Sequence, residues 1–424
     1  MLQVAVIREQ QTKVLNGLAK RNFKNASELV SAVLQKDDLR KDTQRTLDDL
    51  KAKANVDAKK IGELIKAGKS DEANLLRAAV ATTKDKTKTL ENSLTDLEKE
   101  LIDLLYKIPN VPHEKVPAGA GADDNITVSQ HGVVPTLEKD ALPHWELIKK
   151  YDIIDFDLGV KISGAGFPVY KGKGAKLQRA LINFFLDEAE KQAYNEVQPP
   201  IVVNEASGYG TGQLPDKEGQ MYFVNEDGLY LIPTAEVPIT NLYRDVIVPD
   251  DQLPVKNVGY TPCFRREAGS WGAHVRGLNR LHQFDKVEIV QIRKPEESHL
   301  ALDEMCSYVQ SLLEKLELPY RKLLLCGGDM GFNSAITYDM EVYAAGQQRW
   351  LEVSSVSNFE TFQANRLKLR YKNADGKTQL LHTLNGSALA LPRIVAAILE
   401  NNQDSNGIRI PKILVPYTKF EMIN

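Results

Sequence analysis

The chain has 424 residues, of which 42% are hydrophobic and 26% are charged, as in an ordinary globular protein of two or three domains. Its formal net charge of −3 excludes a generally basic nucleic-acid-binding protein, so any contact with RNA must come from a local patch. The three cysteines, Cys263, Cys306 and Cys326, show no CxxC spacing, which excludes a disulfide framework and a cysteine-rich zinc site and favours a reducing compartment.

The first segment, MLQVAVIREQQTKV, lacks the apolar stretch of a signal peptide. No later run approaches the roughly 18 apolar residues that would span a membrane. We therefore expect a cytoplasmic protein that makes no membrane contact.

The segment from Asn25 to Tyr106 is predicted to be helical, because it contains no proline and only two glycines, Gly62 and Gly68. In its second half, apolar and threonine residues recur at spacings of three and four, as in a coiled coil: Leu76, Val80, Thr83, Thr87, Leu90, Leu94, Leu97, Leu101 and Leu104. A weaker seam in the first half comprises Leu47, Leu50, Ala54, Ile61 and Leu64.

The sequence AGKSDE separates the two halves. Gly68 can end one helix, Ser70 can cap the next, and Asp71 and Glu72 suit the positive end of its dipole. The pattern predicts an antiparallel hairpin of two long helices, which would project about 50 to 60 Å.

The distal part of this arm is basic. Between residues 51 and 88 there are five acidic residues and ten basic ones: Lys51, Lys53, Lys59, Lys60, Lys66, Lys69, Arg77, Lys84, Lys86 and Lys88. A rod with a net charge of +5 can contact phosphates by shape and charge. Taken alone, these residues favour a solvated coiled coil used for dimerisation.

The segment KIPNVPHEKVPAGAGADDN is rich in Pro and Gly and is predicted to be a linker. Beyond it, residues 174–192 and 298–316 have helical periodicity, and residues 199–204, 228–233 and 285–292 are typical of short strands. Strands and helices do not alternate regularly, which favours an α+β fold with an antiparallel sheet.

Three later segments carry candidate chemistry. Residues 261–288 place three glycines and four arginines between two strand-like ends, where arginine forks could bind a nucleotide or where the chain could form an exposed hairpin. In LEVSSVSN, Glu352 and Ser355 are hard oxygen ligands suited to magnesium, although these residues alone favour a half-buried strand. In LNGSALALPRI, Arg393 lies at the start of a predicted helix. These residues alone indicate only a charged side chain on the surface.

Together and in this order, these segments resemble the class II aminoacyl-tRNA synthetases, and the seryl-tRNA synthetase family in particular. The resemblance covers the whole chain and includes these segments: GTGQLP (210–215), PTAEVP (233–238), CFRREAG (263–269), HQFDKVE (282–288), GDMGFNSAITYDMEV (328–342), LEVSSVSNFETFQANR (351–366) and LNGSALALPR (384–393).

The resemblance implies an N-terminal tRNA-binding domain (1–107) with the helical arm at about 26–106, and a class II catalytic domain (108–424) built on an antiparallel sheet. Motif 1 would lie at about 174–203, with Pro199 or Pro200 at a dimer interface, motif 2 at about 261–288 and motif 3 at about 382–402. The implied activity is that of a serine–tRNA ligase, an ATP-dependent enzyme that forms seryl-adenylate and pyrophosphate and then esterifies tRNA(Ser), and by family resemblance tRNA(Sec). The implied partners are L-serine and a tRNA that bridges the subunits of a homodimer.

By resemblance, Arg265 would bind the α-phosphate and the serine carboxylate, Glu267 the adenine amino group and Phe284 the adenine ring. Arg280 and Arg393 would bind the outer phosphates, and Glu352 and Ser355 would bind Mg²⁺, with no zinc. The full sets implied are Arg265 and Arg393 for catalysis; Arg265, Arg266, Glu267, Arg280, Phe284, Glu352, Val353, Ser354, Ser355 and Arg393 for ATP; and Thr234, Ala235, Glu236, Arg265, Glu288, Asn385 and Ser387 for serine.

The chain departs from the family pattern in the motif 2 loop, at Ala273, His274, Val275 and Asn279, and in motif 3, where Ala388 replaces a common glycine. The loop departures put the contact with the tRNA acceptor end in doubt. Two rivals remain: a paralogue that loads a carrier protein, which the basic arm disfavours, and a catalytically silent coiled-coil adaptor, which the retained site residues disfavour.

Overall fold

The computed structural model describes residues 1–216, 219–267 and 275–424. Contacts divide the chain into two compact units. The smaller unit comprises Leu2–Ala19 and Phe23–Pro109, and the larger comprises Met1, Lys20–Asn22 and Asn110–Asn424. Within the described residues, no helix is both long and apolar enough to cross a membrane.

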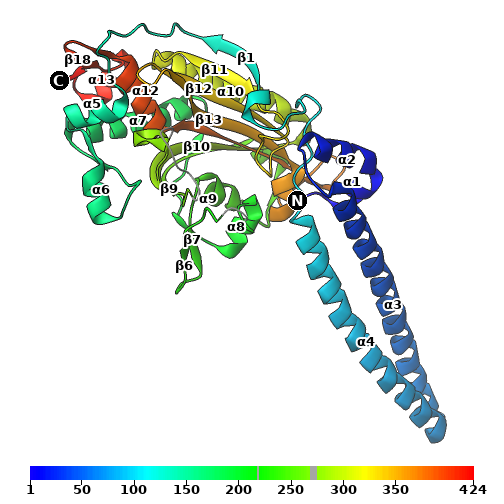
Figure 1. Cartoon of the computed structure of the whole chain (residues 1–424). Coiled ribbons are helices and arrows are strands. Elements are labelled where there is room, and N and C mark those ends of the chain that lie inside the picture. The colour runs from blue at the N-terminus through cyan, green and yellow to red at the C-terminus, as the bar shows by residue number, and fades with distance from the viewer. Residues whose placement is uncertain (217–218, 268–274) are drawn as a thin grey trace. The chain divides into compact units, whose positions relative to one another are not determined.

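The smaller unit is dominated by a long antiparallel helical hairpin (Figure 1). Its helices are α1 (Val4–Glu9), α2 (Gln11–Lys20), α3 (Ala26–Lys66) and α4 (Ser70–Leu105). Along α4, all nine predicted seam positions from Leu76 to Leu104 are buried or half-buried, whereas the residues between them are exposed. The coiled-coil arm is therefore confirmed.

The turn between α3 and α4 is built as a Schellman motif. Gly68 has φ +74° and donates its N–H to Ile65, and Lys69 donates to Leu64 at 2.9 Å. The expectation that Ser70 caps α4 is wrong, because Ser70 is already the first helical residue and Lys69 is at the cap position without a side-chain cap. Lys69 both completes the C-terminal motif of α3 and occupies the cap position of α4, so α4 begins one residue earlier than a serine cap at position 70 requires.

An eight-stranded sheet forms the centre of the larger unit, in the order β1-β11-β12-β13-β16-β10-β9-β4 (Figure 1). All neighbours pair antiparallel except β4 and β9, which are parallel. The strands are β1 (Ile126–His131), β11 (Tyr320–Leu324), β12 (Ile336–Ala344), β13 (Arg349–Glu360), β16 (His382–Ala390), β10 (Gln283–Arg293), β9 (Val255–Phe264) and β4 (Asn195–Glu196).

Alternation along the strands gives this sheet one apolar and one polar face. In β12, Ile336, Met340 and Val342 enter the core, whereas Asp339 and Glu341 point the other way. The apolar face is covered by α7 (Gly172–Lys191), α10 (Ser298–Lys315) and α12 (Leu391–Asn401), whose buried residues share one core cluster with the strands. The polar face is thus left for a site.

Shorter elements complete the larger unit. The helices are α5 (His144–Lys150), α6 (Phe156–Ile162), α8 (Glu205–Thr211), α9 (Glu236–Asn241), α11 (Thr361–Leu367) and α13 (Val415–Thr418). Small sheets join β15 (Thr378–Leu380), β14 (Arg370–Lys372) and β8 (Ile247–Val248); β17 (Gln403–Asp404), β18 (Gly407–Arg409) and β19 (Met422–Ile423); β2 (Ile154–Asp155) and β3 (Val169–Tyr170); and β5 (Val202–Asn204), β7 (Leu229–Leu231) and β6 (Phe223–Val224).

The predicted helices at residues 174–192 and 298–316 correspond to α7 and α10. The strand predicted at residues 199–204 is shorter, because β5 starts only at Val202. Pro199 and Pro200 lack the N–H groups that a strand ladder needs, so pairing begins after them.

Candidate active site

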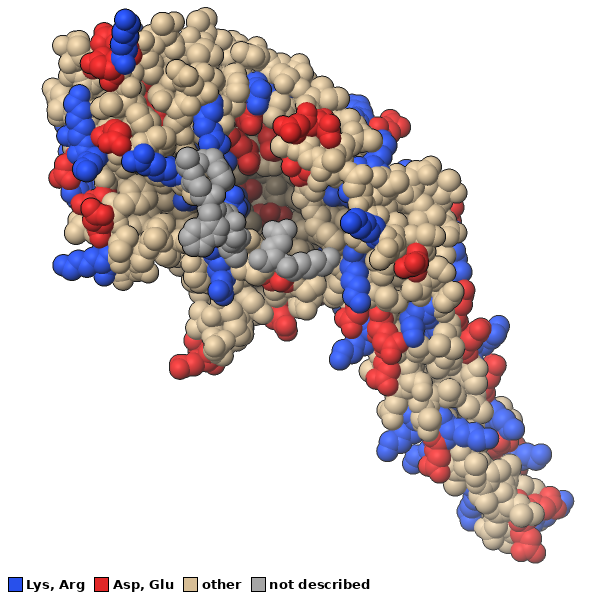
Figure 2. All heavy atoms as spheres, viewed as in Figure 1, with Lys and Arg blue, Asp and Glu red and all other residues tan. Residues whose placement is uncertain are grey.

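The polar face of the sheet brings together side chains from strands that are far apart in sequence. Register places Glu288 of β10 opposite Ser387 of β16, and Asn385 of β16 opposite Ser357 of β13. Figure 2 shows a recess in the larger unit with acidic side chains inside it. Because directly paired residues point to the same face, these polar groups form one continuous row across the sheet.

One end of this row is a buried polar pocket around Glu288, which is only 2% exposed. The Glu288 carboxylate pairs with the ammonium of Lys286 at 2.5 Å and lies 3.4 Å from the hydroxyl of Ser387. Lys286 also donates to the hydroxyl of Thr234 at 2.7 Å. The pocket therefore offers a carboxylate, an ammonium and two hydroxyls, a set that can recognise a small zwitterion with a hydroxyl group.

Glu236, at the start of α9, is the second buried carboxylate of the pocket. Its Oε1 accepts a hydrogen bond from Nε2 of Gln363 at 2.6 Å. Burial, and secondly the negative charge of Glu288, raise the pKa of Glu236 to about 7. Nearby, Nδ2 of Asn385 is buried without a hydrogen-bond partner among the described residues, so it can donate to a ligand.

The other part of the site follows β9. Arg265 comes directly after this strand; its Nε donates to the carbonyl of Pro233 at 3.3 Å and its guanidinium carbon lies 5.2 Å from the centre of the Phe284 ring. Glu267 is ion-paired with Arg280, which precedes β10. A cation stacked on an aromatic ring beside an exchangeable ion pair can receive a planar, negatively charged ligand such as a nucleotide.

Glu352 and Ser355 lie on β13, beside Asp339 of β12. Register pairs Asp339 directly with Ser355. Burial, and secondly the charge of Glu352, hold the pKa of Asp339 well above its ordinary value, and Oδ1 of Asp339 has no hydrogen-bond partner among the described residues. Hard oxygen donors with an unsatisfied carboxylate oxygen fit a divalent cation. The described residues contain no group of three or more His, Cys, Asp or Glu side chains suited to a metal, so phosphate or water oxygens would have to complete its shell.

Arg393 lies in the first turn of α12. Its Nη1 donates to the Glu352 carbonyl at 2.6 Å and lies 3.5 Å from the Glu352 carboxylate, while Nε donates to the carbonyl of Asn279 at 3.1 Å. The fold thus places Arg393 beside Glu352, although they are 41 residues apart in sequence.

Several predicted site residues do not point their side chains into the polar pocket. The side chains of Val353 and Ala235 are buried in apolar clusters, so only their backbones could contact a ligand. Ser354 donates its hydroxyl to the carbonyl of Ser387 at 2.6 Å, and Arg266 is exposed.

The residues that depart from the family pattern lie in different environments. Ala273 and His274 lie outside the described residues, and Val275 is half-buried. Asn279 is 5% exposed and donates to Gln347 at 2.7 Å, so its side chain has an internal role. Ala388 is fully buried in the main core cluster, where its extra methyl group is packed.

Sequence reasoning missed three polar residues, of which Lys286 and Gln363 are buried and Asp339 is half-buried. Lys286 could have been found from strand alternation, because residues 284, 286 and 288 of β10 share one face. Gln363 and Asp339 gave no local signal, because their role depends on partners from other strands and helices.

All ten predicted basic residues of the arm are exposed. Figure 2 shows basic side chains on the hairpin, interspersed with acidic ones. Lys51 pairs with Glu91 at 2.8 Å and Lys69 with Glu72 at 3.0 Å. Exposed pairs of this kind contribute little to stability and can be exchanged for pairs with phosphates.

Comparisons with known proteins agree with this arrangement. Residues 1–112 match the seryl-tRNA synthetase N-terminal domain, and residues 222–402 match the tRNA synthetase class II core domain (G, H, P, S and T). The chain is 48% identical to the serine–tRNA ligase of Salinibacter ruber, covering 100% of this chain and 99% of the relative, and 46% identical to that of Akkermansia muciniphila, covering 98% and 97%. The crystal structure of seryl-tRNA synthetase from Pyrococcus horikoshii complexed with ATP is 33% identical, with a TM-score of 0.93 over 100% of this chain and 99% of that one. With both domain types matched and relatives similar over their full length, the chain belongs to the seryl-tRNA synthetase family.

Proposed function

We propose that the protein is a serine–tRNA ligase that activates L-serine with ATP and transfers it to the 3′ end of tRNA(Ser). The observation that carries the proposal is the polar face of the sheet. There, a pocket suited to a hydroxylated zwitterion (Glu288, Ser387, Lys286) adjoins an arginine-lined nucleotide site (Arg265, Arg393). By resemblance, tRNA(Sec) is a second acceptor.

In the first step, a carboxylate oxygen of serine attacks the α-phosphorus of ATP, the bond to the bridging oxygen breaks, and pyrophosphate leaves. Both groups are anionic, so Arg265 at the α-phosphate and Arg280 and Arg393 at the outer phosphates reduce their repulsion. No general base is needed, because the serine carboxylate is ionised at neutral pH. In the second step, a ribose hydroxyl of the tRNA attacks the acyl carbon and AMP leaves.

Arg265 is 5.2 Å from the Phe284 ring, on which adenine is proposed to stack. Glu267, now paired with Arg280, would release that arginine to the phosphates and accept from the adenine amino group. Arg266 and the backbones of Val353 and Ser354 complete the proposed ATP contacts. Glu352, Ser355 and the neighbouring Asp339 would hold Mg²⁺, which neutralises phosphate charge when bound.

Selectivity for serine is assigned to Thr234, Glu236, Glu288, Asn385 and Ser387, with Ala235 contributing backbone. Alanine lacks the hydroxyl and would leave buried polar groups of this pocket unpaired, which costs binding free energy. Zinc is not part of the proposed chemistry, since the activating charges are arginines and phosphate-bound magnesium.

We infer that residues 1–107 form a tRNA-binding domain and residues 108–424 the catalytic domain of a cytoplasmic enzyme. Helices of 41 and 36 residues give an arm about 60 Å long, and its exposed lysines suit the phosphate backbone of RNA. A carrier protein would not require such a rod, which favours tRNA as the acceptor.

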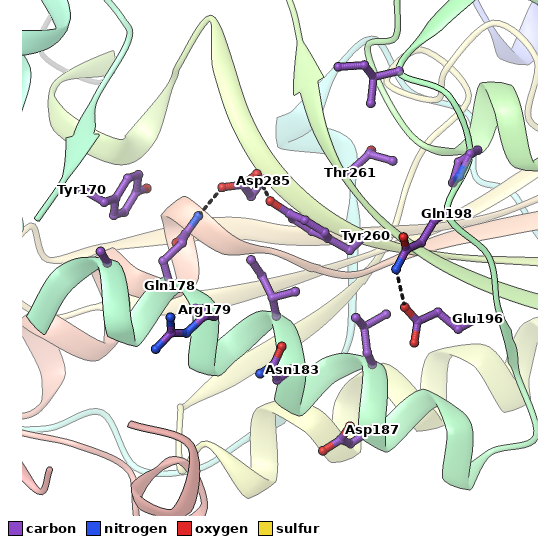
Figure 3. Close-up of a pocket in the computed structure, with 15 residues that line it drawn as sticks. Tyr170, Gln178, Arg179, Asn183, Asp187, Glu196, Gln198, Tyr260, Thr261 and Asp285 are labelled. Carbon is purple, nitrogen blue, oxygen red and sulfur yellow. Dashed lines mark hydrogen bonds between the residues drawn. The ribbon is translucent and has the colours of Figure 1, made fainter. Parts of the chain in front are cut away.

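We also propose a homodimer, with tRNA bridging the subunits. Motif 1 borders an open groove of about 820 Å³ between α7 and the segment that contains Pro199 (Figure 3). Ile201 and Val202, beside it, are 37% and 36% exposed. An exposed apolar segment next to a groove suits an isologous interface.

Light scattering at micromolar concentration should give about 95 kDa, twice the chain mass of 47.4 kDa, whereas a value near the chain mass would contradict the dimer.

Serine binding should depend on the protonation of Glu236, whose pKa is raised to about 7. The ammonium of serine favours the ionised carboxylate, so below pH 7 a proton must leave on binding. We expect the KM for serine to be about tenfold higher at pH 6 than at pH 8, as one group titrating near 7 requires. Glu236→Gln should remove this dependence, and an unchanged pH profile in that variant would exclude Glu236 as its origin.

The raised pKa of Glu236 also makes the free energy of unfolding depend on pH. The folded protein binds this proton more tightly than the unfolded chain, so the contribution of Glu236 to the free energy of unfolding falls as pH rises from about 4.5 to about 7. Ligand-free enzyme should show this loss, and saturating serine should reduce it.

The activity itself is tested by serine-dependent exchange of pyrophosphate into ATP, followed by charging of tRNA(Ser). Both reactions should occur with magnesium and persist with a zinc-selective chelator. Exchange without charging would point instead to a carrier-loading paralogue.

A further inference from the structure

A buried hydrogen-bond network leads to the two arginines proposed to bind the outer phosphates. Its centre is His144, the first residue of α5, whose side chain is 0% exposed. His144 Nδ1 lies 2.7 Å from Oε1 of Glu400, which is on α12 and equally buried. On the other side of the ring, Nε2 accepts a hydrogen bond from the backbone N–H of Leu278 at 2.9 Å.

These partners define the tautomer of His144. Glu400 Oε1 also accepts from the backbone N–H of His144 at 2.9 Å and from Nε2 of Gln347 at 2.8 Å. An oxygen that accepts from these donors requires Nδ1 to carry the ring proton. Nε2 must then be the acceptor, because a proton there would oppose the N–H of Leu278. The carboxylate thus keeps the far ring nitrogen available for Leu278.

The residues around Leu278 form the end of the motif 2 loop. Gly277 has φ +67°, and a Cβ there would lie 2.3 Å from Nε2 of His144, so the ring packs directly against this turn. The next two residues of α5 also contact it: the Trp145 ring lies 4.9 Å from the Arg276 guanidinium, and Glu146 accepts from Arg276 at 3.2 Å. Three successive residues of α5 therefore fix the turn just before the ATP-binding arginine of motif 2.

A second branch runs from Glu400 to motif 3. Gln347, between β12 and β13, donates its backbone N–H to Glu400 Oε2 at 3.0 Å and accepts from Nδ2 of Asn279 at 2.7 Å. The carbonyl of Asn279 in turn accepts from Nε of Arg393. Asn279, one of the departures from the family pattern, thus links both arginine-bearing segments.

We propose that His144 and Glu400 are a positioning pair that fixes residues 276–280 through the Leu278 amide, so that Arg280 and Arg393 face the outer phosphates of ATP together. The inference rests on the proposed function, because it takes both arginines as ATP ligands. Loss of the pair should weaken ATP binding and spare serine binding, since the serine pocket around Glu288 is held by separate contacts.

His144→Asn and His144→Gln form a matched pair of variants. The asparagine amide reaches the position of Nδ1 and can keep the contact with Glu400, whereas the glutamine amide reaches the position of Nε2 and can accept from Leu278. In pyrophosphate exchange by the full-length protein, we expect His144→Asn to raise the KM for ATP about tenfold, with the KM for serine changed less than about twofold. In His144→Gln, the KM for ATP and the KM for serine should each stay within about threefold of the values of the unmodified protein.

Glu400→Leu tests the tautomer. It removes the acceptor of the Nδ1 proton, so nothing holds the ring proton on Nδ1 and keeps Nε2 free for Leu278, and the KM for ATP should rise as in His144→Asn. In the His144→Gln background, Glu400→Leu should raise the KM for ATP by less than about a further twofold, because no imidazole remains to change tautomer. This comparison also serves if His144→Asn fails to fold, and melting temperatures of all variants show which are folded.

Equal KM values for ATP in His144→Asn and His144→Gln would overturn the proposal. Equal increases in the KM for ATP and the KM for serine would overturn it as well. Either result would mean that His144 and Glu400 contribute only to the packing of the fold. Dissociation constants for ATP, measured by calorimetry on the same variants, give this answer independently of catalysis. A failure of the unmodified protein to catalyse serine-dependent exchange would contradict the proposed function, and the ATP constants would still decide the role of His144.

Discussion

Replacing residues 52–87 of the arm with a short turn should leave serine activation almost unchanged and lower the rate of tRNA charging by about a hundredfold or more, because the shortened arm can no longer bind several phosphates of the tRNA at once. Lys51 and Glu91 lie across the hairpin at 2.8 Å, so a short connection can join the helices near this point. Pyrophosphate exchange, charging and oligomeric state are measured on the same protein. Equal losses in exchange and charging would contradict a tRNA-binding arm, and loss of subunit association would indicate a dimerisation element.

A charge variant separates the basic residues from the length of the rod. Neutralising Lys59, Lys60, Lys84 and Lys86 should weaken charging more gently, and should reduce the salt dependence of tRNA binding by about 0.7 to 0.9 in slope for each phosphate that the arm no longer neutralises. The matched control neutralises four exposed lysines of the larger unit, Lys372, Lys377, Lys412 and Lys419, and changes the net charge equally. Similar slopes for the two variants would show that net charge alone, and no interaction of the arm, governs binding.

Arg265→Ala should lower the kcat/KM of serine activation by about a thousandfold, because it removes the cation proposed to bind both reacting groups. The fold should persist, since the Arg265 side chain is half-buried and, among the described residues, donates one hydrogen bond, to the carbonyl of Pro233 at 3.3 Å. Arg409→Ala, at an arginine that is 69% exposed, is the control for removal of one arginine. Near-normal exchange by folded Arg265→Ala would mean that the role assigned to this residue is wrong.

For the serine pocket, the ion pair between Lys286 and Glu288 decides which variant is informative. Glu288→Ala would leave a buried ammonium without its carboxylate, which destabilises the fold as well as the site. Glu288→Gln keeps the shape and can still accept from Lys286, so it should raise the KM for serine strongly with a small change in melting temperature. An unchanged KM for serine in Glu288→Gln would exclude a contact with the substrate.

The sequence patterns predicted those parts of the molecule that depend on local periodicity. The arm follows from the seam between Leu76 and Leu104, and the antiparallel sheet was expected because the predicted strands and helices do not alternate regularly. Family motifs predicted which residues line the site, and the structure places Glu288 beside Ser387 and Arg393 beside Glu352. The roles assigned to these residues remain proposals.

What could not be predicted depends on contacts between distant segments. His144 and Glu400 are 256 residues apart, and no sequence pattern connects His144 with the motif 3 segment that contains Glu400. Gln363 is 127 residues from Glu236, and its importance appears only when α11 lies beside α9. The cap of α4 was wrongly predicted at Ser70 for a related reason, because the end of α3 determines which residue is free to cap the next helix.

The measurement that tests the central claim most directly is pyrophosphate exchange into ATP by the unmodified protein, with each amino acid offered in turn. The polar pocket around Glu288 and Ser387 should give strong exchange with serine, much weaker exchange with alanine, which lacks the hydroxyl, and weak exchange with threonine, which must be excluded by shape. Magnesium should be required. Exchange supported by another amino acid in preference to serine, or by none, would contradict the account.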